Sequence, residues 1–122
     1  MEREGDFIAS IYYGRISSRA TERLLERFGR DGSFLLRDSE TLPGAYCLCV
    51  RRAPFVHTYR LMHSSDGWFL QGPSRRKFPK LQTLLENYRT GHSTESPTVP
   101  LIDPLDKTQL PYLSFGPEYL EM

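Results

Sequence analysis

Arg37 is the residue whose type and position most directly imply chemistry. It follows three large apolar residues, Phe34–Leu36, that are typical of a short buried strand, and it precedes the polar run Asp38–Thr41. Because side chains alternate along a strand, Arg37 shares a face with Leu35. A buried guanidinium is costly without a partner, and it suits an anion that accepts two parallel hydrogen bonds, such as phosphate or carboxylate. Ser39 and the turn amides beside it are further donors for such an anion.

A simpler interpretation stays open from this stretch alone. Arg37 is then a strand-end arginine that reaches solvent or pairs with Asp31, Asp38 or Glu40.

A second arginine favours the anion site. Arg60 belongs to another apolar, strand-like stretch, and neighbouring strands would bring it to the face of Arg37 with Cys47 between them. The start of a helix at Ser17–Arg19 would cover the same face, and helix N-termini favour anions. Two arginines beside an apolar floor therefore predict a local anion site.

Two amphipathic helices and at least three antiparallel strands are expected to position these residues. One helix is capped at Ser17 or Ser18, carries the stripe Ala20, Leu24, Leu25 and Phe28, and stops at Gly29. The strands correspond to GSFLLRDS, Ala45–Val50, Phe55–Met62 and Trp68–Leu70. The second helix has Pro79 in its first turn, ends at Gly91 and carries the stripe Phe78, Leu81, Leu84, Leu85 and Tyr88. Since the strands are apolar on both faces, each face needs a cover. The fold class is therefore α+β, with a central antiparallel sheet flanked by two helices.

The composition excludes several classes of function. The chain has 122 residues and a net charge of +1, which indicates one domain without a general attraction for nucleic acid or a membrane surface. No run is apolar enough to insert into a membrane, and the N-terminus lacks a secretory signal. Cys47 and Cys49 share a strand face and cannot bridge, which favours a reducing, cytoplasmic location. The three histidines lack metal-ligand spacing, and neither a Walker loop nor a nucleophile–base pair is visible. We therefore expect no metal, no cofactor and no enzymatic activity.

The domain boundaries follow from where the patterns stop. Residues 1–11 have no clear period and are expected to form an N-terminal arm. Residues 12–104 form the domain, and the proline- and glycine-containing residues 105–122 form a C-terminal tail.

The motifs YYGRIS, DGSFLLRDSE, GAYCLCV, HTYR and KFPKLQTLLENY, in this order, resemble a Src-homology-2 (SH2) domain. The resemblance implies a central antiparallel sheet between two helices and the binding of phosphotyrosine peptides. It implies that Arg37 clamps the phosphate and that Arg60 packs beside the phosphotyrosine ring, over a floor that includes Cys47. Ser39, Glu40 and Thr41 then form the phosphate-binding loop.

The first helix departs from a common family pattern, in which an arginine occupies the position of Ser18. Arg19 is one position later, about 100° around the helix. The sequence leaves open whether Arg19 compensates for Ser18 in the phosphotyrosine site.

The resemblance also implies a pocket for peptide residues downstream of the phosphotyrosine. Its wall consists of Tyr59, Leu70 and Tyr88, with Val99 and Leu101 near the rim. Peptide residues upstream would contact Phe55 to His57, and Thr58 is a further candidate for peptide contact. The sequence leaves open whether an unphosphorylated peptide binds.

Within the family, the chain is most similar to the small adapters of the SLAM-associated-protein type. This implies a monomeric cytoplasmic adapter that docks on tyrosine-phosphorylated receptor tails in immune-type signalling. Tyr119 and Tyr112 are candidate phosphorylation sites that would engage signalling kinases or other SH2 proteins. Pro79 stands where the founding adapter uses an arginine to recruit a kinase, which disfavours that route. The alternative is the SH2 module of a larger signalling enzyme such as an inositol 5-phosphatase; Met1 and the ordinary tail favour the adapter.

Overall fold

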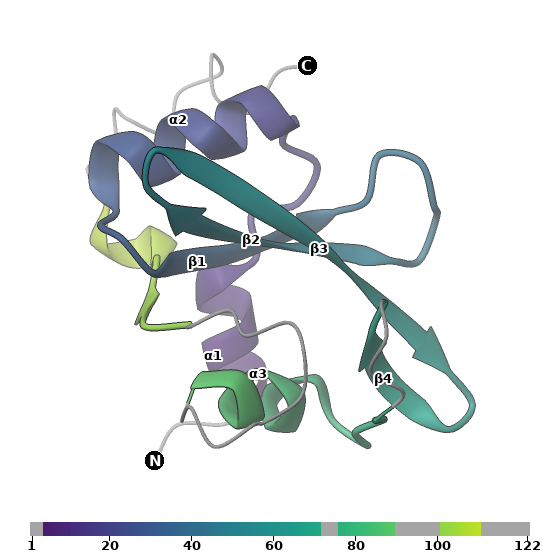
Figure 1. Cartoon of the computed structure of the whole chain (residues 1–122). Helices are drawn as coiled ribbons and strands as arrows, with labels where there is room; N and C mark the ends of the chain where they lie inside the picture. The colour runs from purple at the N-terminus through teal and green to yellow at the C-terminus, as the bar shows by residue number, and fades with distance from the viewer. Residues whose placement is uncertain (1–3, 72–75, 90–100, 111–122) are drawn as a thin grey trace.

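A five-stranded, mostly antiparallel sheet crosses the middle of the molecule (Figure 1). The computed structural model describes residues 4–71, 76–89 and 101–110. Its elements are α1 (Glu4–Ile11), α2 (Ser18–Phe28), β1 (Ser33–Asp38), β2 (Tyr46–Arg52), β3 (Phe55–Ser64), β4 (Gly67–Leu70), α3 (Leu81–Arg89), β5 (Asp103–Pro104) and the 3-10 helix η1 (Lys107–Gln109). The strand order is β4-β3-β2-β1-β5, and β1 pairs with β5 in parallel. The α+β prediction is confirmed.

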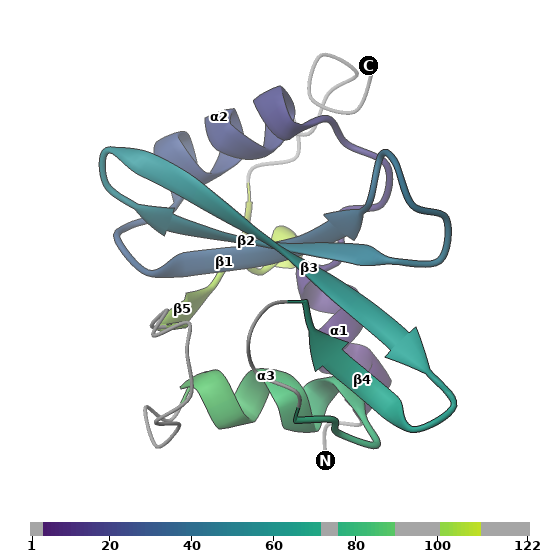
Figure 2. The ribbon, with the colours of Figure 1, turned by 45° about the vertical axis from the view of Figure 1, so that its right-hand side comes forward.

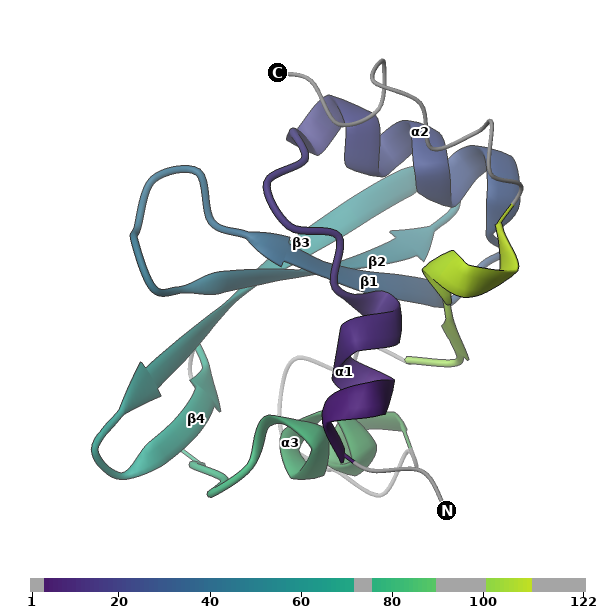
Figure 3. The ribbon, with the colours of Figure 1, turned by 180° about the vertical axis from the view of Figure 1, so that it is seen from behind.

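Helices cover both faces of the sheet. Figures 2 and 3 show α2 on one face and the pair α1 and α3 on the other. Alternation along the strands divides the core accordingly. Leu35, Cys47 and Cys49 pack with α2, whereas Phe34 and Leu36 belong to the cluster shared with α1 and α3. The predicted faces of the first two strands are therefore confirmed.

The ends of α2 are fixed by identifiable bonds. The Ser17 hydroxyl accepts a hydrogen bond from the amide of Ala20 at 3.0 Å, which makes Ser17 the N-cap. At the other end, Nη1 of Arg51 donates to the carbonyls of Leu25 at 3.2 Å and Gly29 at 2.7 Å. The cation thus adds donors to carbonyls at the C-terminal end of the helix and interacts favourably with the helix dipole.

The expected N-terminal arm differs most from the structure. Residues Glu4–Ile11 form a helix, and Ile11 is fully buried in the core cluster beneath the sheet. An eight-residue helix is marginal in isolation, so α1 depends on packing against β1 and α3.

The expected boundaries of the second helix and of the tail also need correction. Helix α3 begins at Leu81, so Pro79 precedes it, and Phe78 pairs with Trp68 through a β-bridge. Leu105, in the expected tail, is 5 % exposed, and its carbonyl accepts a hydrogen bond from the Tyr13 hydroxyl at 2.7 Å. Gly91, the expected stop of the second helix, lies outside the described residues.

The segment between α1 and α2 is hydrogen-bonded to the end of β1. The amide of Tyr13 donates to the carbonyl of Leu36 at 2.9 Å, and the amide of Asp38 donates to the carbonyl of Gly14 at 2.8 Å. The Tyr12 hydroxyl donates to Oδ1 of Asp38 at 2.6 Å. This side-chain bond, followed by burial, raises the pKa of Tyr12 to about 12.

None of the helices described here is both long and apolar enough to span a lipid bilayer.

The packing of α1 predicts a stability effect at its last residue. We expect Ile11→Ala to lower the free energy of unfolding by about 2–5 kcal/mol, because it removes buried methyl groups from the core. Denaturant unfolding measures this. The matched control is Ile102→Ala at a side chain that is 58 % exposed, for which we expect a loss of less than about 1 kcal/mol. Equal losses for the two variants would contradict the docked helix.

The bond between Tyr12 and Asp38 predicts a titration shift. Because the folded state favours the neutral phenol, its contribution to stability is complete below pH 10 and is lost as the pH rises towards 12. We expect Asp38→Ala to lower the pKa of Tyr12 towards 10, as followed by NMR of the Tyr12 ring. Glu40→Ala is the control and should leave this pKa unchanged; the same result for Asp38→Ala would refute the assignment.

Candidate functional site

Arg37 is a buried cation with an unsatisfied donor. Its side chain is 4 % exposed, and Nη1 donates to the carbonyl of Asp38 at 3.2 Å. The Nε atom is buried and has no hydrogen-bond partner among the residues that the structure describes. No described carboxylate forms an ion pair with Arg37; the Asp31 carboxylate instead accepts a bond from the amide of Ala53, and Asp38 is bound to Tyr12. Pairing with these two residues, the simpler interpretation, is not what the structure shows.

The sheet register places two arginines on either side of one cysteine. Arg37 is directly opposite Cys47 across β1 and β2, and Cys47 is directly opposite Arg60 across β2 and β3. Cys47 is 6 % exposed and packs in the cluster beneath α2. The predicted convergence of the two arginines around Cys47 is confirmed.

The loop after β1 is closed by its own hydrogen bonds. Oγ of Ser39 accepts bonds from the amides of Thr41 at 3.4 Å and Leu42 at 3.1 Å, while the Ser39 amide donates to the carbonyl of Ala45 at 3.0 Å. Nη2 of Arg60 donates to Oγ1 of Thr41 at 3.1 Å, which ties β3 to this loop. The loop therefore presents hydroxyl groups next to the two strand arginines.

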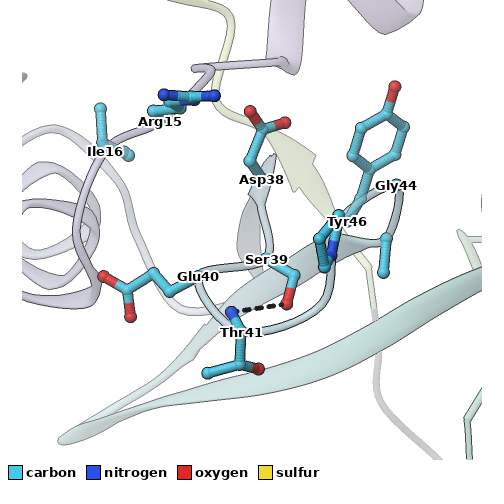
Figure 4. A pocket seen from close by; sticks show the side chains of 10 residues that line it. Arg15, Ile16, Asp38, Ser39, Glu40, Thr41, Gly44 and Tyr46 are labelled. Carbon is cyan, nitrogen blue, oxygen red and sulfur yellow. Dashed lines mark hydrogen bonds between the residues drawn. The ribbon is translucent and has the colours of Figure 1, made fainter.

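A pocket of about 530 Å³ opens over this loop (Figure 4). Its lining comprises Arg15, Ile16, Asp38, Ser39, Glu40, Thr41, Pro43, Gly44, Ala45 and Tyr46. Ser39, Glu40 and Thr41 were predicted from the sequence, whereas Arg37, Cys47 and Arg60 lie in the adjoining strands and outside this lining. Ser18 and Arg19 are exposed on the first turn of α2 and do not line the pocket either. Sequence reasoning missed Arg15, although its position directly after a glycine that ends an extended segment was a signal.

The second cysteine is a structural residue. Cys49 is completely buried, and the Thr58 hydroxyl lies 3.8 Å from its sulfur, as a donor. Burial raises the pKa of the Cys49 thiol to about 11, so it stays protonated near neutral pH. Both cysteines are free, as the sequence predicted.

The residues expected to contact peptide fall into two groups. Phe55, His57 and Thr58 are exposed on β3, and His57 stacks on Tyr59 with ring centroids 6.4 Å apart. Burial raises the pKa of the half-buried Tyr59. Strand β4 pairs only with the part of β3 from Leu61 onward, so the preceding part of β3 pairs on its β2 side alone among the described strands.

The second group lies deeper. Leu70, Tyr88 and Leu101 are 5 %, 7 % and 1 % exposed and belong to the core cluster shared with α1 and α3. The structure thus places Leu101 beneath the surface and not at a rim. Val99, Tyr112 and Tyr119 lie outside the described residues.

The arrangement has the chemistry of an anion site. Three arginines lie around the loop after β1: the buried Arg37 with its unsatisfied donor, Arg60 on β3, and the pocket-lining Arg15. The loop itself adds hydroxyl groups. Such donors match phosphate oxygens, which accept charge-assisted hydrogen bonds from arginine. Among the described residues, no cluster of histidine, cysteine or acidic side chains is arranged to hold a metal ion.

Comparison of the sequence with known proteins also indicates a domain that binds phosphate groups. The SH2 domain family model matches residues 11–88. Human SH2 domain-containing protein 1B is 36 % identical over 101 residues, which cover 80 % of this chain and 75 % of that protein. Mouse SH2 domain-containing protein 1B2 is 41 % identical over 83 residues, covering 65 % of this chain and 63 % of that protein.

A much longer protein is also similar to this chain. Human phosphatidylinositol 3,4,5-trisphosphate 5-phosphatase 2 is 42 % identical over 88 residues, which cover 69 % of this chain but only 7 % of the phosphatase. The resemblance to small SLAM-associated-protein-type adapters and to the SH2 module of inositol phosphatases is therefore confirmed at the level of the domain. The SH2 family model matches most of the folded sequence, and the central sheet between helices carries the buried Arg37 on β1. The chain therefore belongs to the SH2 domain family and is a phosphotyrosine-binding module.

Proposed function

We propose that this protein is a monomeric cytoplasmic adapter that binds tyrosine-phosphorylated motifs in receptor tails in immune-type signalling. The observation that carries the proposal is the buried Arg37, whose Nε has no hydrogen-bond partner in the described parts of the chain and which is separated from Arg60 by Cys47 on the strand between them. The similarity to SH2 domain-containing protein 1B over 101 residues supports the adapter class.

The phosphate would supply what Arg37 lacks. A phosphotyrosine carries close to two negative charges and three acceptor oxygens, so it can accept parallel bonds from one guanidinium. Because Arg37 lies at the inner end of the site, a long aromatic side chain reaches it, whereas phosphoserine falls short. In this assignment Ser39, Glu40 and Thr41 surround the phosphate as a loop, and Ser18 and Arg19 stand at the helix end of the site.

The rest of the peptide would cross β3. The phosphotyrosine ring would pack beside Arg60 and over Cys47, and the pairing of these two residues across β2 and β3 supports this placement. Residues upstream run along the exposed stretch of Phe55, His57 and Thr58, where the β3 edge offers backbone donors and acceptors. Residues downstream would approach Tyr59, Leu70 and Tyr88 as the wall of their pocket, with Val99 near its rim and Leu101 buried beneath it.

The binding unit would comprise residues 12–104, with flanking parts of the chain packed on it. Ile11 and Leu105 are both buried, which supports including α1 and the residues up to 110 in the folded unit. In the flanking segment, Tyr119 and Tyr112 would serve as phosphorylation sites that engage signalling kinases or other SH2 proteins.

A second candidate is the SH2 module of a signalling enzyme such as an inositol 5-phosphatase. The observation that favours it is the 42 % identity to the human phosphatase over 88 residues. The match to SH2 domain-containing protein 1B extends further, over 101 residues, and for this reason the adapter is preferred.

If Arg37 binds the phosphate, it should be responsible for the preference for the phosphorylated peptide over the unphosphorylated one. We expect Arg37→Ala to weaken binding of a tyrosine-phosphorylated peptide by about 2–5 kcal/mol, because it removes a buried charge partner. Arg37→Lys should lose part of this, since lysine cannot form the bidentate pair. Calorimetric titration measures both, with a peptide chosen on an array that carries each sequence with and without phosphate.

Arg23→Ala, at an exposed position of α2, is the matched control and should bind like the wild type. Equal affinities for the two forms of the peptide, or no loss in either Arg37 variant, would overturn the proposed site. Thermal unfolding of each variant separates lost binding from lost folding.

The adapter proposal predicts a small protein in cells. An antibody to the domain should detect a species near the 14.2 kDa calculated for this chain. Recovery of the sequence only within a protein several times larger, with inositol 5-phosphatase activity in the immunoprecipitate, would favour the second candidate. Deletion of the gene is the control for antibody specificity.

A further inference from the structure

We propose that Arg15 is a third cation of the phosphotyrosine pocket and contributes the charge that Ser18 does not supply. This assignment rests on the proposed phosphotyrosine-binding function. It starts from a contrast between two arginines on either side of Ser18. Both side chains are exposed, but Arg15 lines the pocket above the loop after β1, whereas Arg19, on the first turn of α2, does not line it.

The backbone holds Arg15 in place. The two residues before it are hydrogen-bonded to β1, through the amide of Tyr13 to the carbonyl of Leu36 and through the amide of Asp38 to the carbonyl of Gly14. Gly14 has a φ of +71°, a conformation that other residues rarely adopt, and there the chain turns from β1 towards α2. The backbone before Arg15 is therefore fixed next to the loop by hydrogen bonds to β1, and the position of Arg15 does not depend on where α2 begins.

The pocket brings Arg15 and the loop together. Figure 4 shows Arg15 at one end of the pocket and Thr41 at the other, with Ser39 between them. Thr41 is the residue to which Arg60 donates its hydrogen bond. Arg15 and Arg60 thus approach the pocket from opposite ends.

The charge balance of the pocket calls for another cation. Glu40 and Asp38 both line it, and a phosphate that enters would face their negative charges. The Tyr12 hydroxyl binds the Asp38 carboxylate at 2.6 Å. Within the described parts of the chain, Arg15 forms no ion pair, so its charge is available to the ligand. A phosphate with close to two negative charges gains from each added arginine.

The experiment compares Arg15→Gln with the matched variant Arg19→Gln. Each is titrated with the phosphorylated and unphosphorylated forms of one array-selected peptide, and with phenyl phosphate followed by NMR. We expect Arg15→Gln to weaken both phosphorylated ligands about tenfold, the usual loss for one charge-assisted hydrogen bond, and to reduce the salt dependence of binding. Arg19→Gln should change either affinity less than twofold. Adding Ser18→Arg to Arg15→Gln should restore most of the loss.

Several results would overturn the role of Arg15. These are unchanged affinity for both phosphorylated ligands in Arg15→Gln, an equal loss in Arg19→Gln, or an equal loss for the unphosphorylated peptide. Failure of the proposed function is a separate outcome, because the wild type would then bind the two forms of the peptide equally and Arg37→Ala would have no effect. Matching melting temperatures of wild type and variants establish that the losses arise in the pocket.

Discussion

The burial of one unpaired guanidinium is the constraint on which the rest of this structure depends. Desolvating a charge is expensive, and Arg37 has no acidic partner in the described chain to offset that cost. The fold tolerates it because the surrounding sheet and helices are well packed on both faces. A buried cation of this kind gains most from a ligand that carries the opposite charge, which supports the proposed preference for a phosphorylated tyrosine over an unphosphorylated one.

The two faces of the sheet place different residues around this arginine. On the α2 side, the register aligns Arg37, Cys47 and Arg60 in one row, with a small apolar residue between two cations. Asp38 is the next residue and belongs to the other strand face, where its carboxylate accepts a hydrogen bond from the Tyr12 hydroxyl and also lines the pocket. Strand alternation thus places the Asp38 carboxylate on the face opposite to the Arg37 side chain, and the Tyr12 phenol is its hydrogen-bond partner. The same bond joins the segment before Arg15 to the end of the strand that carries Arg37.

Much of the central fold could be predicted because its periodic signals are local and strong. The stretch around Arg37, the alternation of Cys47 and Cys49, and the stripe of α2 each bury residues that recur at a fixed spacing. Helix α1 could not be predicted, since eight residues carry little periodicity and their helical state is stabilised by α3 and β1. Leu105 was assigned to a tail for a similar reason: it is buried in the cluster beneath α2, and its carbonyl accepts a bond from Tyr13, a partner 92 residues away.

The sequence by itself determined the strand that carries Arg37, the face it shares and the family to which the chain belongs. These follow from residue type and from the period of two along a strand, which are properties of neighbouring positions. Only the tertiary structure decided which cations meet at the pocket. Arg19 is nearer to the helix start that sequence reasoning favoured, yet Arg15 lines the pocket, because the bonds of Tyr13 and Gly14 to β1 fix its backbone beside the loop. Convergence of that kind depends on long-range hydrogen bonds that no local pattern encodes.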